Sequence, residues 1–261
     1  MDLSFGLMLV AAFVAGAINA VAGGGTLFTF TALGLVMDLR HANATNSALL
    51  TPASFSSAIA FRQELALHWR RFVILAVPSL AGAWTGALGF VHTDNELFKR
   101  VVPFLILFAV LLFAFKDQFA AVVRRMLAAP TVTADRDHIA LSSWIAGSAF
   151  QFIVACYGGY FGAGIGILMI ASFHLMGMRD LHVMNALKNP LACLMNGTAT
   201  ACFIFKGLID WQYAIPMSVC AVLGGYSAAL ASRRINQKYL RWFVIGYGLV
   251  ISVFLFVRYW L

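Results

Sequence analysis

The chain has 261 residues, of which 62% are hydrophobic and 11% are charged, and its net charge is +8. An ordinary soluble domain carries about 25% charged residues, so this composition excludes a soluble globular protein and indicates an integral membrane protein. The Lys and Arg residues lie at the ends of apolar stretches, where they favour one membrane orientation rather than nucleic-acid binding.

The predicted elements are all helical, because apolar stretches near the roughly 20 residues of a membrane-spanning helix recur along the whole length. The fold class is therefore all-α, with ten apolar segments and about eight full spans. The segments are 3–21, 26–37, 43–60, 72–92, 101–115, 139–157, 163–177, 186–205, 212–231 and 240–260.

One long polar connection, which contains RRMLAAPTVTADRDH, divides the chain nearly in half. It predicts a first membrane repeat at 1–116, a cytoplasmic linker at 117–138 and a second membrane repeat at 139–261. The two halves also resemble each other in sequence. When the chain is shifted by 142 residues, 38–90 matches its counterpart at eleven of 53 positions, Gly82 with Gly224 among them. This indicates an internal duplication.

Three consecutive glycines, Gly23, Gly24 and Gly25, interrupt the first apolar run, and GAGIG, with Gly164 and Gly166, interrupts the corresponding run of the second half. Unpaired backbone groups cost several kcal/mol each in lipid, so a break is tolerated only where it is buried in protein or lines a cavity. Close packing of helices through small residues is the alternative. The recurrence of the break favours a functional role.

Charge placement predicts that each broken run is a hairpin that enters and leaves on one side. Single crossings would put nine Lys and Arg on each side of the membrane, whereas hairpins leave thirteen inside and five outside, the asymmetry expected of a real topology. The repeats are then inverted, with both termini outside the cytoplasm, as in secondary transporters that bind substrate near the midplane. The five outside residues are Arg40, Lys99, Arg100, Lys206 and Arg258.

A polar segment follows each glycine break. The first contains Asn43, Thr45 and Asn46, and the second contains Asn185 and Lys188. The pairs Asn43/Asn46 and Asn185/Lys188 are spaced to share one helix face. Amide and hydroxyl donors beside a helix N-terminus favour an anion. Helix capping and interhelical bonding remain the alternative for each amide, and a side chain that reaches the cytoplasmic surface remains the alternative for Lys188.

The ten Asp and Glu residues all lie in loops or at the ends of segments, so no carboxylate is placed to relay protons or bind sodium at the midplane. No metal-ligand spacing, catalytic triad or phosphate loop occurs. We expect no enzymatic activity, no cofactor and no metal.

The stretches GAINAVAGGGTLFTFTALGL and HANATNSALLTPASFSSAIAFR resemble the first repeat of the sulfite exporter TauE/SafE family, and GGYFGAGIGILMI resembles the second. The resemblance covers essentially the whole chain. It implies a multi-pass permease of the bacterial inner membrane that exports sulfite or organosulfonates. It also implies substrate-binding roles for Gly23, Gly24, Gly25, Asn43, Thr45 and Asn46 and, by internal symmetry, for Gly164, Gly166, Asn185 and Lys188.

The expected partners are a small anionic substrate and the lipid bilayer, with a homodimer left open and no nucleic acid. Two alternatives stay open at this point. The same scaffold would also suit another small oxyanion or an organic acid, and a membrane-embedded accessory subunit belongs to a different functional class.

Overall fold

A computed structural model describes residues 3–21, 24–115, 118, 141–178, 180–231 and 237–260, and this part of the chain consists of helices and short connections, with no strand. The predicted all-α class is confirmed for these residues. Except for residue 118, the predicted linker at 117–138 lies outside them. The first half contains α1 (Leu3–Val21), α2 (Thr26–Leu33), α3 (Leu39–Ala60), α4 (Arg62–Leu67), α5 (Trp69–His92) and α6 (Asn95–Ala114). The second half contains α8 (Leu141–Tyr160), α9 (Ile165–Leu175), α10 (Leu181–Phe205), α11 (Trp211–Ala231) and α12 (Gln237–Trp260).

Several helices begin earlier in the chain than the apolar segments from which they were predicted. α3, α6 and α10 start four to six residues earlier than predicted, each directly after an aspartate. The Asp94 carboxylate accepts the Leu97 N–H at 2.7 Å, and Asp180 accepts the His182 N–H at 2.8 Å. These aspartates satisfy backbone donors that a helix start leaves unpaired. Hydropathy detects only the apolar part of each helix and so misses its polar first turns.

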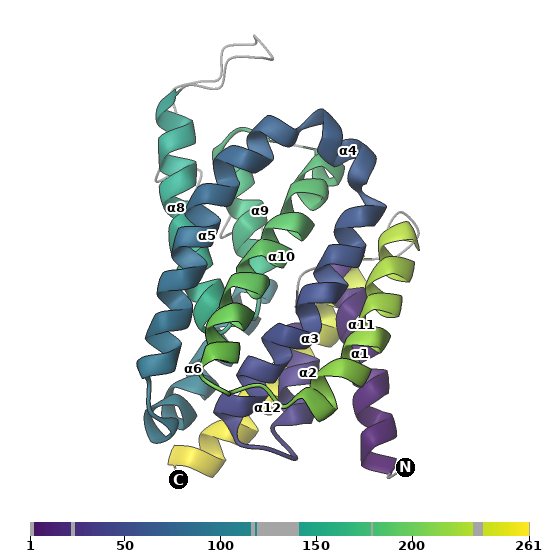
Figure 1. Ribbon diagram of the computed structural model, residues 1–261, viewed down its shortest axis with the longest axis vertical. Helices are drawn as coiled ribbons and strands as arrows, with labels where there is room; N and C mark the ends of the chain where they lie inside the picture. Colours follow the sequence, from purple (N-terminus) through teal and green to yellow (C-terminus); the bar gives the residue numbers. More distant parts are fainter. Residues whose placement is uncertain are drawn as a thin grey trace.

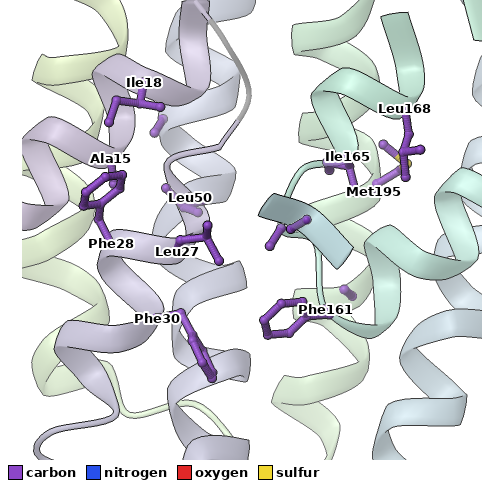
Figure 2. Packing of buried hydrophobic residues seen from close by; sticks show 14 of the residues in the cluster. Ala15, Ile18, Leu27, Phe28, Phe30, Leu50, Phe161, Ile165, Leu168 and Met195 are labelled. Carbon is purple, nitrogen blue, oxygen red and sulfur yellow. The ribbon is translucent and has the colours of Figure 1, made fainter. Parts of the chain in front are cut away.

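Both broken runs fold as hairpins. Figure 1 shows α1 rising from the N-terminus at the bottom of the view, with α2 returning toward that end, whereas α8 descends from the top and α9 returns upward. Figure 2 shows buried apolar side chains around both turns, with Leu27 and Phe28 beside Ala15 and with Phe161 below Ile165. Each hairpin is therefore enclosed by hydrophobic packing.

The helix contacts of the two halves are reciprocal. α1 packs along α11 as α8 packs along α5, and α3 packs against α11 as α10 packs against α5. The remaining large contacts, α3 with α10 and α6 with α12, join helices at equivalent places in the two halves. α6 and α12 run antiparallel, since Ser252 Oγ donates to the Pro103 carbonyl at 2.9 Å and Trp260 Nε1 donates to the Arg100 carbonyl at 3.0 Å.

One sequence identity between the halves has a direct structural reason. A Cβ at Gly82 of α5 would lie 2.4 Å from the Phe152 carbonyl oxygen of α8, and a Cβ at Gly224 of α11 would lie 2.0 Å from the Phe13 carbonyl oxygen of α1. No larger residue fits either contact without moving a helix. The matched glycines thus keep two equivalent helix pairs in close contact, as small residues do in membrane proteins.

Among the described residues, three helical segments are long and apolar enough to cross a membrane: Trp69–His92, Asn95–Ala114 and Trp242–Trp260. Less than half of each is buried within the protein, so these segments present apolar side chains outward. By contrast, α3 and α10 carry buried polar side chains, Asn43 and Lys188 among them. The fold thus buries the polar side chains of α3 and α10 and exposes apolar side chains of α5, α6 and α12.

Candidate functional site

The two glycine breaks pack against the same face of α6. A Cβ at Gly24 would lie 2.1 Å from Cζ of Phe113, and a Cβ at Gly164 would lie 3.4 Å from Cβ of Ala109, one turn earlier in α6. Residues 140 positions apart in the chain therefore meet at one level of the fold. Gly23 lies outside the described residues.

The first break depends on close packing. A Cβ at Gly25 would lie 1.9 Å from the Ala15 carbonyl oxygen of α1, which leaves no room for any other residue. The Gly25 N–H donates to Asn19 Oδ1 at 3.1 Å. The side chain of Asn19 thereby satisfies a backbone donor that the break exposes.

The second break depends on backbone conformation. Gly162 and Gly164 have φ angles of 82° and 78°, in the left-handed region that glycine adopts without steric cost. α9 begins immediately after Gly164, and Gly166 lies in its first turn. The two breaks thus reach similar hairpins through different properties of glycine.

The predicted polar residues of α3 are engaged in structural hydrogen bonds. Asn46 Oδ1 accepts from Thr29 Oγ1, and Asn46 Nδ2 donates to the Thr26 carbonyl at 3.3 Å, which ties α3 to α2. Asn43 Nδ2 donates to the carbonyl of Tyr160 at the end of α8 at 2.9 Å, and Asn43 Oδ1 is buried without a partner.

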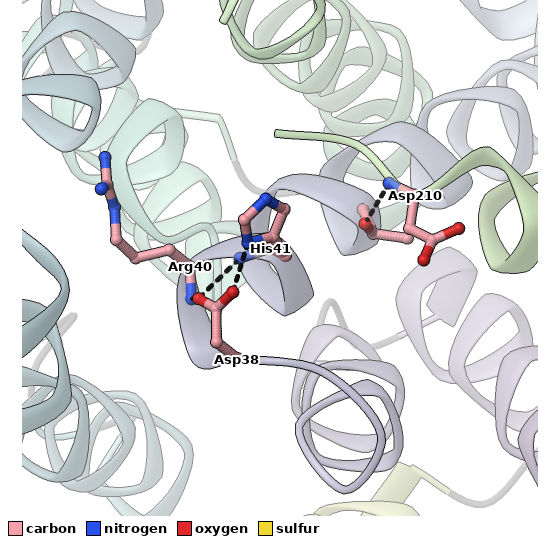
Figure 3. Close-up of polar contacts among 5 residues, drawn as sticks. Asp38, Arg40, His41 and Asp210 are labelled. Carbon is pink, nitrogen blue, oxygen red and sulfur yellow. Dashed lines mark hydrogen bonds and ion pairs between the residues drawn. The ribbon is translucent and has the colours of Figure 1, made fainter. Parts of the chain in front are cut away.

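Thr45 supports the connection between α10 and α11. Its Oγ1 accepts the Asp210 N–H at 3.0 Å. Figure 3 shows Asp210 together with Asp38, Arg40 and His41 at the start of α3. There, the Asp38 carboxylate accepts the Arg40 N–H at 2.9 Å and contacts the His41 ring. Thr45 is completely buried.

In α10, Lys188 is buried, with 1% of its surface exposed. Its Nζ donates to the Ala20 carbonyl, in the last turn of α1, at 3.4 Å. The ammonium group therefore points into the protein, and the alternative of a side chain that reaches the cytoplasmic surface is excluded. No described carboxylate forms an ion pair with it, since the described salt bridges are His41–Asp38 and Lys99–Glu96.

Two asparagines flank Lys188. Asn189 is 3% exposed, and its Nδ2 is buried without a hydrogen-bond partner. Asn185 is 8% exposed, and its Oδ1 is likewise unpartnered. A buried polar atom without a protein partner is costly, and a bound ligand or water would supply the missing hydrogen bond.

A small cavity lies where both hairpins meet α3 and α10. Its empty space is about 390 Å³, including the part that opens to solvent. It is lined by Asn19 and Ala20 of α1, Thr26 of α2, Ala53, Ser54 and Ser57 of α3, Ile165, Gly166 and Met169 of α9, and Lys188, Asn189, Ala192 and Asn196 of α10.

Of the ten predicted site residues, the cavity brings together Gly166 and Lys188. Gly24, Gly25 and Gly164 shape the turns around it, while Asn43, Thr45 and Asn46 hold neighbouring helices in place. The predicted site did not include the polar lining residues Asn19, Thr26, Ser54, Ser57, Asn189 and Asn196, although the last four belong to the polar segments that follow the glycine breaks. Helical spacing offered a signal for some of them, since Asn189 and Asn196 are seven residues apart on one face of α10.

The polar lining of this cavity combines one positive charge with neutral hydrogen-bonding groups. Lys188 provides the one formal charge among its described lining residues, and the other polar groups are neutral amides and hydroxyls. The first turns of α2 and α9, at Thr26 and Gly166, also border the cavity. The N–H groups of a first turn have no partner within their own helix and carry partial positive charge.

Nothing in the described part of the chain gathers three or more His, Cys, Asp or Glu side chains where they could hold a metal ion. The four cysteines, Cys156, Cys193, Cys202 and Cys220, are free thiols. The cavity therefore has to be understood from its hydrogen-bond donors and its single lysine.

A model of the family described as sulfite exporter TauE/SafE matches residues 8–255. A probable membrane transporter protein of Haemophilus influenzae is 28% identical over 243 residues, which cover 91% of this chain and 89% of the relative. The probable membrane transporter protein YfcA of Escherichia coli K12 is 27% identical over 261 residues, which cover 96% and 88% of the two chains. A further relative, the probable membrane transporter protein ORF9 of a Sinorhizobium species, is 26% identical over 85% of this chain and 82% of its own length. No solved structure gives a significant match.

Proposed function

Because this chain belongs to the sulfite exporter TauE/SafE family of membrane transporters, we propose that it exports small sulfur-containing anions, such as sulfite or organosulfonates, across the bacterial inner membrane. The proposal treats the chain as a multi-pass secondary transporter and not as an enzyme. The substrate is assigned to the cavity between the two hairpins, α3 and α10.

The observation that carries this proposal is the buried Lys188. An isolated buried ammonium ion is strongly unfavourable unless a partner of opposite charge compensates it. Lys188 lines the cavity, and no described carboxylate pairs with it. A mobile anion would supply the missing partner. This explanation fits a transporter, because a permanent carboxylate at this position would compete with the substrate.

The donors around Lys188 support the same proposal. Asn189 Nδ2 has no partner among the described residues, and Thr26 and Gly166 lie in first helical turns that border the cavity. Donors of this kind stabilise an oxyanion in a site that excludes water. Asn19, which accepts from the Gly25 N–H, keeps the first turn in place beside the cavity.

We also propose that the halves, 1–116 and 139–261, are inverted repeats separated by a cytoplasmic linker at 117–138. The reciprocal helix contacts support this arrangement, as do the opposite directions of α1 and α8 in Figure 1. The starts of α3 and α6 and the ends of α10 and α12, which carry the five outside Lys and Arg residues, lie at the end of the molecule where both termini lie. Reporter fusions test this inverted arrangement. A fusion after Arg71 is expected to report the cytoplasm, and a fusion after Gly207 is expected to report the outside. Reporters on the same side of the membrane would contradict the arrangement.

Outward movement of an anion is driven by the membrane potential of a cell that is negative inside. The contribution is about 2.3 kcal/mol per elementary charge per 100 mV. The proposed exporter therefore has no need of a carboxylate at the midplane for proton or sodium coupling, and no Asp or Glu is among the described residues that line the cavity.

Proteoliposomes loaded with sulfite test the function directly. We expect sulfite efflux above that of sulfite-loaded liposomes without the protein when the membrane potential favours anion exit. Lys188→Met preserves side-chain length and removes the charge, and it is expected to lower efflux by about 10- to 100-fold, as for the loss of a hydrogen bond to a charged group. Lys206→Met, at the exposed end of the same helix, is the matched control and should leave efflux unchanged. Equal efflux from the two variants would contradict the assignment to this cavity.

A competition panel separates the proposed substrates from the alternatives on the same scaffold. Organosulfonates should inhibit sulfite efflux more strongly than phosphate or small carboxylates. Stronger inhibition by a carboxylate would transfer the proposal to organic acids. An accessory subunit would give no flux with any member of the panel.

A further inference from the structure

We infer that the cavity selects singly charged anions, so that hydrogen sulfite, rather than the sulfite dianion, is the species that crosses the membrane. The inference rests on the proposed function, because it concerns the charge of the anion held by the same cavity. It goes beyond that function by stating which ionic form is carried.

The cavity contains a single formal charge. Lys188 provides it from α10, and the groups that face it from the other four elements are uncharged. These groups are Asn19 and the Ala20 carbonyl from α1, Thr26 from α2, Ser54 from α3 and Gly166 from α9. No second Lys, Arg or His belongs to the described lining.

The protein itself holds the Lys188 side chain in place, without a bound anion. Its Nζ donates to the carbonyl of Ala20 in the last turn of α1, where the partial negative charge of a helix C-terminus favours a cation. The nearest carboxylate along α10, that of Asp180, lies eight residues earlier, about 12 Å along the helix axis. The remaining N–H groups of the ammonium are thus available to a ligand that brings its own negative charge.

The cost and the gain of binding scale differently with the charge of the ligand. The free energy of removing an ion from water rises with the square of its charge, whereas its attraction to Lys188 and to the neutral donors rises in direct proportion. A dianion therefore incurs about four times the desolvation cost of a monoanion for about twice the attraction. With one lysine and no second cation, the balance favours the monoanion.

The chemistry of sulfite makes this selectivity measurable, because sulfite exchanges between singly and doubly charged forms near neutral pH. The experiment uses the full chain in proteoliposomes with three probes. Sulfite changes charge with pH, methanesulfonate remains singly charged, and sulfate remains doubly charged. Empty liposomes correct for passive leakage at each pH.

We expect the ratio of sulfite efflux to methanesulfonate efflux, at constant total concentrations, to fall about tenfold for each pH unit above the second ionisation of the acid. Methanesulfonate efflux at each pH corrects for any change in the charge of the protein, and sulfate should remain at the level of liposomes without protein. A ratio of sulfite to methanesulfonate efflux that does not change with pH would overturn the inference.

Two further outcomes separate this inference from the proposed function. Sulfate efflux, or a ratio of sulfite to methanesulfonate efflux that holds constant or rises as the dianion accumulates, would overturn the selectivity for monoanions and leave an anion exporter. Absence of efflux for all three probes would overturn the exporter itself, and the inference with it.

Discussion

Asn46 and Lys188 occupy equivalent positions in the two halves, 142 residues apart, and they serve different purposes. Asn46 makes hydrogen bonds with Thr29 and with the Thr26 carbonyl, which tie α3 to α2. Lys188 reaches the Ala20 carbonyl of the opposite half and lines the cavity. The duplication therefore supplies the scaffold twice, whereas the charge that the proposed substrate needs is present once.

The glycine breaks differ in a similar way. Gly25 has a helical φ of −61° and is required because the Ala15 carbonyl leaves no space for a side chain. Gly164 has a φ of 78°, and a Cβ added there would meet its nearest neighbour at an ordinary contact distance of 3.4 Å. One break depends on packing and the other on backbone conformation, so equivalent turns tolerate different substitutions.

The strongest test of the difference between Asn46 and Lys188 exchanges the two residue types. Asn46→Lys should destabilise the protein by about 3–5 kcal/mol, because it buries a charge where α2 and α3 provide no partner. Lys188→Asn should keep the fold and lower efflux by about 10- to 100-fold. Thermal unfolding and efflux measure the two effects separately. A folded, active Asn46→Lys variant would mean that the two positions are interchangeable.

Alanine at each glycine break tests the second comparison. Gly25→Ala should cost up to about 3 kcal/mol, because a core that has no free space must move to accept a methyl group. Gly164→Ala should cost about 1–2 kcal/mol, the steric penalty of the left-handed conformation. The unfolding temperatures of the purified variants give the order. A larger loss for Gly164→Ala would contradict the assignment of packing to one break and conformation to the other.

Thr45→Val measures how much the polar segment of α3 contributes to structure alone. The substitution keeps the shape of the side chain and leaves the Asp210 N–H without its acceptor. We expect a loss of about 1 kcal/mol in stability, while the half-saturating sulfite concentration stays unchanged. A marked rise in that concentration would move Thr45 into the binding site.

The smallest expected effect on stability concerns the cap at the start of α3, where aspartate is compared with asparagine at position 38. Partial burial raises the pKa of the Asp38 carboxyl, but the hydrogen bond and charge of His41 and the N–H groups of Arg40 and His41 outweigh it and leave the pKa below its usual value. The stabilisation is therefore present above the unfolded-state pKa of about 3.9 and is lost as the pH falls through the lower value of the folded state.

Asp38→Asn keeps a good cap and removes the charge. The stability difference between Asp38→Asn and the wild type should shrink as the pH falls below about 4. Denaturant unfolding at several pH values measures it. A difference that does not change with pH would show that the carboxylate charge adds nothing to the cap.

Much of the architecture was predictable because it follows from composition and periodicity. The apolar segments predicted the helices, and the sequence match between the halves indicated equivalent positions such as Gly82 and Gly224, which make equivalent contacts. The starts of α3, α6 and α10 were placed too late, since an aspartate cap and a polar first turn leave no trace in hydropathy. The short helix α4 was not predicted, because its first three residues, Arg62, Gln63 and Glu64, are polar.

The sequence by itself determined a helical membrane protein with two related halves, two glycine breaks and one lysine in an apolar helix. In lipid, every backbone N–H and C=O group must be hydrogen-bonded within the protein, so a spanning segment forms a helix. Local sequence patterns are therefore enough to predict these features. Only the tertiary structure decided which polar residues face the cavity. Asn43, Thr45, Asn46 and Asn189 look alike in sequence, but their roles depend on the partners that other helices bring to them. Those partners lie up to 165 residues away in the chain. Packing between helices therefore determines which donors remain free.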